Sequence, residues 1–221
     1  MKVRIKKILQ PPIVQIALDM PSVSFLRAIL RQIPISDRII VEAGTALIKK
    51  YGVKIIRLIR RELGDVFVVA DLKTQDVGRI EAHLAYEETA DGAVVSGTAP
   101  RHTIEEFLRE SNNLQMWGIV DMLNVYDPLK VLGSLCVLPD IIVLHRGIDE
   151  EQQKTLSLPL INKIKKKFGA HLLVAVAGGV NLESAREALS AGADILIVGR
   201  YITASKEPRK AINEFLSLIR R

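Results

Sequence analysis

Residues 66–76 read Val-Phe-Val-Val-Ala-Asp-Leu-Lys-Thr-Gln-Asp, an apolar run that gives way to three charged side chains. An uninterrupted apolar run of this kind predicts a strand buried on both faces. Side chains alternate along a strand, so we expect Asp71 and Lys73 on one face at its carboxyl end. Charges of both signs are costly to bury unless they pair or bind something. This predicts a functional site; the alternative is a structural ion pair of Lys73 with Asp71 or Asp76, with Thr74 or Asp76 capping the next helix.

Apolar runs of this kind recur along the whole chain, and their starts lie about 25 residues apart, the room that a strand, a helix and two short loops need. Segments with helical periodicity lie between them, such as residues 25–30. Eight such units without a break in composition predict one (β/α)8 TIM barrel domain over residues 1–221, with an open doubly wound sheet as the alternative. The predicted strands are residues 13–18, 38–41, 66–70, 93–96, 118–120, 141–144, 172–177 and 195–198.

Two further local signals concern the helix ends. Thr103, followed three residues later by a glutamate, predicts a capping box that opens the fourth helix. Glycines precede several of the apolar runs, where left-handed residues that end helices are expected. These glycines are Gly64, Gly92, Gly169 and Gly192.

The composition indicates a protein of modest charge. The formal net charge is +6, and the densest basic cluster, residues 163–167, falls at a predicted helix end, where cations are favourable. With five Phe and one Trp, the sequence has no aromatic pattern for gripping single strands, and we predict no nucleic-acid partner. Cys136 is the single cysteine, so we expect no intrachain disulfide and a place for Cys136 in the core. We also predict no membrane span and no cleaved signal, hence a cytoplasmic protein.

In such barrels the residues just past the carboxyl ends of the strands form the active face. Nearly every predicted strand here delivers a polar, charged or glycine residue to that rim. In chain order the rim residues are Asp19, Glu42, Thr45, Asp71, Lys73, Asp76, Ser96, Thr98, Asp121, Asn124, His145, Gly178, Gly179, Gly199 and Arg200. Packing alone does not readily place so many polar residues at one end, so we expect the site there.

The last two strands predict a phosphate site. Glycines after a strand let backbone N–H groups approach an anion, and the next helix adds positive potential. These glycines are Gly178, Gly179 and Gly199; a tight turn at the first two is the alternative. Asn181 with Ser184 is suited to capping the following helix. Arg200 can hold a phosphate with two hydrogen bonds.

Carboxylates on neighbouring strands predict a metal site. Glu42 and Asp71 can meet over the barrel mouth, and an oxygen-only pair that leaves room for water suits Mg²⁺. Lys73 beside them could stabilise an enediolate. The alternative for Glu42 is a structural pair with a lysine. His145 is the rim histidine and suits a general base.

At these residues the sequence resembles the orotidine 5′-monophosphate decarboxylase suprafamily, and within it the 3-hexulose-6-phosphate synthases. Asp71, Lys73 and Asp76 match the suprafamily signature Asp-x-Lys-x-x-Asp. Further similar stretches follow in order at strand ends over residues 13–215. They are Val41-Glu42-Ala43-Gly44-Thr45, Asp121-Met122-Leu123-Asn124-Val125, His145-x-Gly147-x-Asp149, Ala177-Gly178-Gly179-Val180 and Val198-Gly199-Arg200.

The resemblance implies a lyase that adds formaldehyde to D-ribulose 5-phosphate, giving D-arabino-hex-3-ulose 6-phosphate, or that cleaves this product. Glu42 and Asp71 would hold Mg²⁺, and Gly179, Gly199 and Arg200 would hold the phosphate. A homodimer with shared active sites is implied, in which Asp76 reaches the partner's site. The candidate catalytic residues are Lys73 for the enediolate, His145 for the proton at C1, Asp76 and Asp19.

Two related activities and one of another class are the alternatives. Orotidine decarboxylases carry a lysine where Glu42 stands and need no metal, which argues against them. 3-Keto-L-gulonate 6-phosphate decarboxylase shares the glutamate, the signature and the histidine. Here Arg146 adds a charge beside His145 and residues 149–151 are acidic. That decarboxylase, and a barrel that binds sugar phosphates without catalysis, remain alternatives to the synthase.

Overall fold

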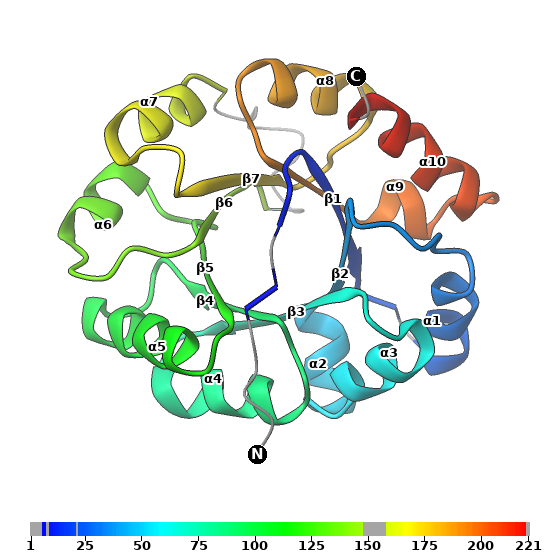
Figure 1. Cartoon of the computed structure of the whole chain (residues 1–221), viewed down its shortest axis with the longest axis horizontal. Coiled ribbons are helices and arrows are strands. Elements are labelled where there is room, and N and C mark those ends of the chain that lie inside the picture. The colour runs from blue at the N-terminus through cyan, green and yellow to red at the C-terminus, as the bar shows by residue number, and fades with distance from the viewer. Residues whose placement is uncertain (1–5, 8, 21, 148–157, 220–221) are drawn as a thin grey trace.

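The computed structural model describes residues 6–7, 9–20, 22–147 and 158–219, and its eight strands close into a parallel barrel (Figure 1). β1 pairs with β2 on one side and with β8 on the other, which excludes the open-sheet alternative. The fold is a (β/α)8 TIM barrel, as predicted. The strands are β1 Ile13–Leu18, β2 Ile39–Ala43, β3 Phe67–Thr74, β4 Gly92–Ser96, β5 Trp117–Asp121, β6 Ile141–His145, β7 Leu173–Ala177 and β8 Ile195–Val198.

Helices surround the barrel on all sides (Figure 1). None of those in the described ranges is both long and apolar enough to cross a membrane. The helices are α1 Val23–Leu30, α2 Thr45–Tyr51, α3 Ile55–Leu63, α4 Gly78–Glu87, α5 Arg101–Asn113, α6 Pro128–Ser134, α7 Leu158–Phe168, α8 Leu182–Ser190, α9 Arg200–Thr203 and α10 Pro208–Ile219.

Alternation along the strands divides the apolar residues into two cores. One set faces outward and packs against the helices, as Val41 and Val68 do. The other set fills the barrel interior, as Ile40 and Val69 do. Because both sets are needed, every strand is apolar at consecutive positions, and this explains why uninterrupted apolar runs mark the strands.

The amino-terminal end of the barrel is closed by a regular set of aspartates. Asp91, Asp140 and Asp194 precede β4, β6 and β8, and each accepts a hydrogen bond from a backbone N–H of the preceding strand, at 2.9, 2.8 and 2.7 Å. Each also pairs with a cation: these are Arg60 for Asp91, Lys6 for Asp140 and Lys165 for Asp194. The amino-terminal segment crosses this end of the barrel (Figure 1), where the Trp117 indole donates to the carbonyl of Lys7.

Several local predictions are wrong. Three strands were predicted to end too early, since β2 continues through Glu42, β3 through Thr74 and β6 through His145. Helix α5 begins at Arg101 after Pro100, which makes no side-chain cap, so Thr103 lies inside the helix. Cys136 is exposed instead of buried in the core.

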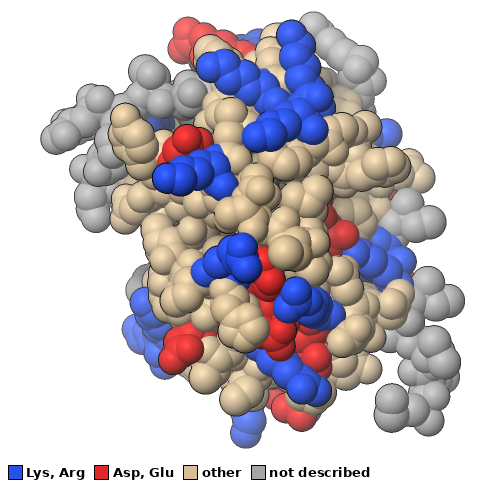
Figure 2. All heavy atoms as spheres, turned by 90° about the vertical axis from the view of Figure 1, so that its left-hand side faces the viewer, with Lys and Arg blue, Asp and Glu red and all other residues tan. Residues whose placement is uncertain are grey.

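Other local predictions concern turns and charge. Gly64, Gly169 and Gly192 have positive φ, but Gly92 does not, because it is the first residue of β4. The basic cluster at residues 163–167 falls in the second half of α7, as predicted. On the side of the barrel that Figure 2 shows, acidic groups lie among basic ones over the lower half.

Candidate active site

The interior alternation of the strands carries polar side chains into the mouth at the carboxyl end of the barrel. On β2, β3, β4, β5 and β6 the residue two positions after a buried interior apolar residue is polar and stands near the carboxyl end, and side chains two apart share a face. The five polar residues are Glu42, Asp71, Ser96, Asp121 and His145, which follow Ile40, Val69, Val94, Ile119 and Val143. All but His145, at the end of β6, are buried.

Lys73 lies among these carboxylates because the backbone of β3 is irregular. The register of β3 with β4 shifts between Ala70 and Thr74, and Lys73 has a left-handed φ of 45°. Its Nζ lies 2.7 Å from Asp71 Oδ2 and 2.8 Å from Asp121 Oδ2. Burial lowers the pKa of the Lys73 ammonium, but these two carboxylates raise it above its ordinary value overall, so the side chain is a cation.

Asp121 joins Lys73 to the rim histidine. The Asp121 Oδ2 atom that accepts from Lys73 also lies 2.8 Å from Nδ1 of His145, while Oδ1 accepts from the backbone N–H of Leu123. Burial raises the pKa of the Asp121 carboxyl, but the hydrogen bonds and charges of His145 and Lys73 hold it at about 2. An ionised Asp121 accepts from Nδ1–H of the His145 ring, so in the neutral tautomer that this contact favours Nε2 is the basic nitrogen.

The two carboxylates predicted to bind metal are held differently. Asp71 Oδ2 accepts from Thr45 Oγ1 at 2.6 Å, whereas its Oδ1 is buried without a hydrogen-bond partner. Glu42 accepts from the side chain of Gln15 inside the barrel. Burial and the charge of Asp71 raise the pKa of Glu42 to about 8. A cation between the two carboxylates would give Asp71 Oδ1 a partner and would favour the ionised form of Glu42.

Asp19 and Asp76 lie at the edge of this group. The Asp19 carboxylate accepts from the backbone N–H of Ala46 at 3.2 Å, and burial raises its pKa. Asp76 is exposed and accepts from the backbone N–H of Val77. The carboxylates that pair with Lys73 are those of Asp71 and Asp121 instead. The capping of α4 by Thr74 or Asp76, part of the structural alternative, does not occur, since Val77 occupies the N-cap position without a side-chain bond.

The predicted phosphate residues lie after β7 and β8. Gly178 and Gly179 have φ of 93° and 63°, and a Cβ on Gly178 would lie 1.9 Å from the carbonyl oxygen of Arg146. Arg146 in turn donates to the Gly178 carbonyl at 3.0 Å, which holds the loops after β6 and β7 together. Asn181 and Ser184 form the capping box of α8. Residues 149–151, singled out as acidic, lie outside the described residues.

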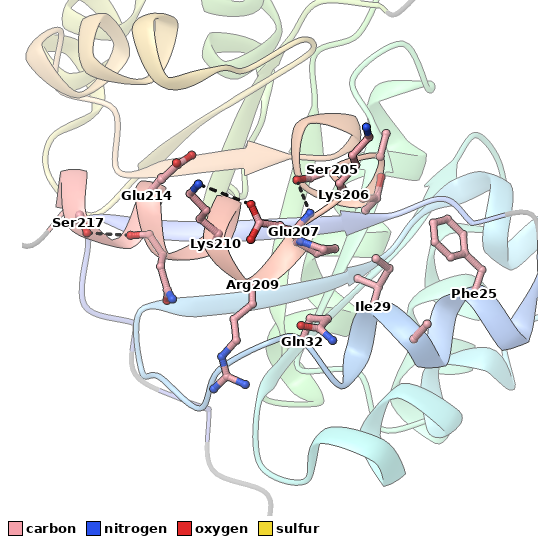
Figure 3. A pocket seen from close by; sticks show the side chains of 15 residues that line it. Phe25, Ile29, Gln32, Ser205, Lys206, Glu207, Arg209, Lys210, Glu214 and Ser217 are labelled. Atoms are coloured by element: carbon pink, nitrogen blue, oxygen red, sulfur yellow. Dashed lines mark hydrogen bonds and ion pairs between the residues drawn. The ribbon is translucent and has the colours of Figure 1, made fainter.

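Arg200 is exposed at the start of α9. It lines a hollow of about 320 Å³ together with Tyr201 and Glu214. A groove of about 950 Å³ adjoins it between α1 and α10 (Figure 3), lined by none of the predicted site residues. In that groove Lys210 lies 3.5 Å from Glu207. The role of Arg200 toward phosphate therefore stays a prediction.

A model of the orotidine 5′-phosphate decarboxylase / HUMPS family matches residues 12–215. The chain belongs to this family. A curated relative, the bifunctional enzyme Fae/Hps of Methanothrix thermoacetophila, is 46% identical over 220 residues, which cover 99% of this chain and 55% of the relative. The chain thus spans about half the length of the curated relatives it matches.

Solved structures of the family superpose over most of the barrel. One 3-hexulose-6-phosphate synthase is 27% identical, with a TM-score of 0.82 over 93% of this chain and 99% of that one. The 3-hexulose-6-phosphate synthase of Salmonella typhimurium is 25% identical, with a TM-score of 0.83 over 93% and 97% of the two chains.

Sequence reasoning brought Glu42, Asp71, Lys73 and His145 to one place but gave Asp121 no role. Asp121 was recognised at the rim, yet the contact that ties it to Lys73 and His145 joins β3, β5 and β6. The alternation of the strands was the signal that could have found it, because Asp121 stands two residues after the interior Ile119. Gln15, which holds Glu42, lies two residues after the interior Ile13 in the same way.

Proposed function

We propose that this chain catalyses the aldol addition of formaldehyde to D-ribulose 5-phosphate, giving D-arabino-hex-3-ulose 6-phosphate, or the reverse cleavage. The observation that carries the proposal is the shared oxygen of Asp121, which joins a cationic Lys73 to His145. The reaction needs a base at C1 and positive charge beside the sugar oxygens, and these two residues can supply them. Similarity to Fae/Hps enzymes and to 3-hexulose-6-phosphate synthases supports the same reaction.

In this mechanism His145 Nε2 takes the proton from C1 while Asp121 stabilises the imidazolium through Nδ1. Lys73 stabilises the negative charge that develops on the enediolate oxygens. C1 then forms a bond to the carbonyl carbon of formaldehyde, and the π electron pair moves to the aldehyde oxygen. That oxygen takes a proton, so the proton lost from C1 is balanced by the one gained.

The donor set fits Mg²⁺ as the cofactor. Glu42 and Asp71 would hold the ion, because Asp71 Oδ1 is buried without a partner and Glu42 is forced toward its neutral form. No group of three or more His, Cys, Asp or Glu side chains in the described part of the chain is arranged to hold a metal. The remaining positions would therefore go to water and substrate oxygens, as Mg²⁺ prefers. When bound, the ion would add positive charge beside the sugar oxygens.

The phosphate of the substrate is assigned to the opposite side of the mouth. Gly178 and Gly179 have left-handed conformations and would offer backbone N–H groups to the phosphate, and Gly199 precedes α9. Arg200 follows directly and would supply a guanidinium.

A homodimer with shared sites is part of the proposal. Val77, Ile80 and Leu84 form an apolar row along α4, and they are 49%, 59% and 38% exposed. Ile80 and Leu84, four residues apart, lie on one face of α4, and with Val77 at its N-cap they favour contact with a second copy. Asp76 stands next to this row and is exposed, so it is placed to reach a partner's mouth.

The test is consumption of ribulose 5-phosphate in the presence of formaldehyde, with Mg²⁺ and with a chelator. Metal-dependent formation of a hexulose phosphate is expected. Lys73→Ala should lose turnover, whereas Lys206→Ala, in the groove beside α10, should match the unaltered chain. Release of carbon dioxide from 3-keto-L-gulonate 6-phosphate instead would favour the decarboxylase alternative. Binding of ribulose 5-phosphate without either reaction would favour the non-catalytic barrel.

A further inference from the structure

A pair of hydroxyl groups at the carboxyl end of β4 has no part in the mechanism above. Ser96 stands two residues after the interior Val94, so its side chain faces the barrel mouth, where it is 5% exposed. On the neighbouring strand β5, the residue paired with Ser96 is Asp121. Ser96 therefore lies beside the carboxylate that holds both Lys73 and His145.

Ser96 is the last member of a hydrogen-bonded chain. Gln75 Nε2 donates to Thr98 Oγ1 at 3.0 Å, and Thr98 Oγ1 lies 2.8 Å from Ser96 Oγ. The backbone N–H of Thr98 also donates to Ser96 Oγ at 3.2 Å. A hydroxyl has one proton and two lone pairs. If Thr98 accepts from Gln75 and donates to Ser96, the acceptor capacity of Ser96 is filled and its own proton is available to a ligand.

The turn that carries these hydroxyls is fixed to the rest of the site. Ala99 N–H donates to the Ser96 carbonyl at 3.1 Å, and Gly97 N–H donates to the Asp121 carbonyl at 2.7 Å. A Cβ on Gly97 would lie 2.8 Å from the sulfur of Met122 and 3.0 Å from the carbonyl oxygen of Asp121, so the absence of a side chain lets this turn pack closely on β5. The position of the Ser96 hydroxyl is thus set relative to Asp121 by backbone contacts.

We propose that Ser96 binds the carbonyl oxygen of the aldehyde substrate, with Thr98 and Gln75 as positioning residues. This inference rests on the proposed aldol function. Asp71 and Asp121 are carboxylates, which would repel an oxygen that becomes negative. Lys73 already donates to both of them, and its one remaining N–H serves the enediolate oxygens. Ser96 offers a neutral O–H donor on the strand beside Asp121. As the new C–C bond forms, the aldehyde oxygen gains the π electron pair, and a donor already in place stabilises that charge.

The test separates the two halves of the reaction. Exchange of the C1 proton of ribulose 5-phosphate with D2O, followed by NMR without formaldehyde, measures enediolate formation alone. In Ser96→Ala we expect kcat/KM for formaldehyde to fall about 100-fold, as for loss of one donor to a developing oxyanion, and exchange to fall less than about threefold. An equal fall in both rates, or no fall in either, overturns the role of Ser96. Absence of both reactions in the unaltered chain overturns the aldol function, and this inference with it.

Two substitutions of Thr98 test its positioning role, with Thr98→Ser as the matched control for Thr98→Val. Thr98→Val removes the hydroxyl at similar volume and should raise KM for formaldehyde about tenfold while kcat falls less, because the Ser96 proton is no longer directed outward. Thr98→Ser keeps the hydroxyl and should restore KM. Failure of Thr98→Ser to differ from Thr98→Val would show that the hydroxyl chain has no role in binding the aldehyde.

Discussion

One carboxylate oxygen of Asp121 contacts both Lys73 and His145. We therefore expect the charge of Asp121 to affect both turnover and the stability of the fold. We predict that Asp121→Asn lowers turnover at least about 100-fold, because the tautomer and charge of His145 are no longer held. The pKa of this carboxyl is about 2 in the folded chain, below its ordinary 3.8. It therefore contributes stability above pH 3.8 that is lost as the pH falls toward 2.

Urea unfolding at a series of pH values measures this contribution. Asp121→Asn should be less stable than the unaltered chain by about 2 kcal/mol near pH 7, and this difference should shrink as the pH falls through 3.8. Asp127→Asn, which alters the exposed N-cap of α6 instead, provides a comparison outside the mouth. A difference between Asp121→Asn and the unaltered chain that does not change with pH would contradict the assignment.

Glu42 affects the pH dependence of stability in the opposite direction to Asp121. Its pKa rises from 4.5 to about 8 on folding, so the metal-free chain loses stability as the pH rises through this window, by on the order of several kcal/mol. Glu42→Gln should remove the loss and be more stable than the unaltered chain at pH 8 without metal. Thermal unfolding at pH 5 and pH 8 tests this. Added Mg²⁺ should raise the melting temperature of the unaltered chain at pH 8 and leave that of Glu42→Gln nearly unchanged.

At the scale of elements, the sequence predicted all eight strands, since each must be apolar toward both the interior and the helices. It placed the ends of β3 and β6 too early because those ends are polar, as Asp71 and His145 are. The left-handed Lys73 was beyond prediction, since a lysine rarely adopts that conformation without support from neighbouring strands. The expected proximity of Asp71 and Lys73 is confirmed, but through a shift in register instead of simple alternation.

The aspartates before β4, β6 and β8 permit a prediction about the opposite end of the barrel. Asp91 is 5% exposed and pairs with Arg60 and Lys7 while accepting from the N–H of Val68. Asp91→Ala leaves the partly buried Arg60 guanidinium and a buried N–H without this acceptor, so we expect a loss of about 2 kcal/mol in urea unfolding. Asp65→Ala, whose side chain is 97% exposed, should cost less than about 0.5 kcal/mol. Turnover should survive both changes, because the mouth lies at the other end of the strands.

At the scale of the whole molecule, the open question is whether one chain holds a complete site. Within the described residues of a single chain, Asp76 reaches neither Lys73 nor His145, although the family resemblance gives it a role in the partner's site. The apolar row of Val77, Ile80 and Leu84 beside it provides a surface for the second copy. If sites are shared, each mouth takes Lys73 from one chain and Asp76 from the other.

Mixing two inactive variants tests this directly. Lys73→Ala and Asp76→Asn should each lose turnover, and mixed dimers should regain about a quarter of the unaltered rate, because half of the dimers are mixed and each has one complete site. The same pair carrying Ile80→Glu should stay inactive when mixed and should elute as monomers, because a charge in the apolar row opposes association. Recovery in the Ile80→Glu pair would place the shared surface elsewhere. Subunit exchange without recovery, confirmed by mass spectrometry of the mixed dimers, would mean that Asp76 acts within its own chain.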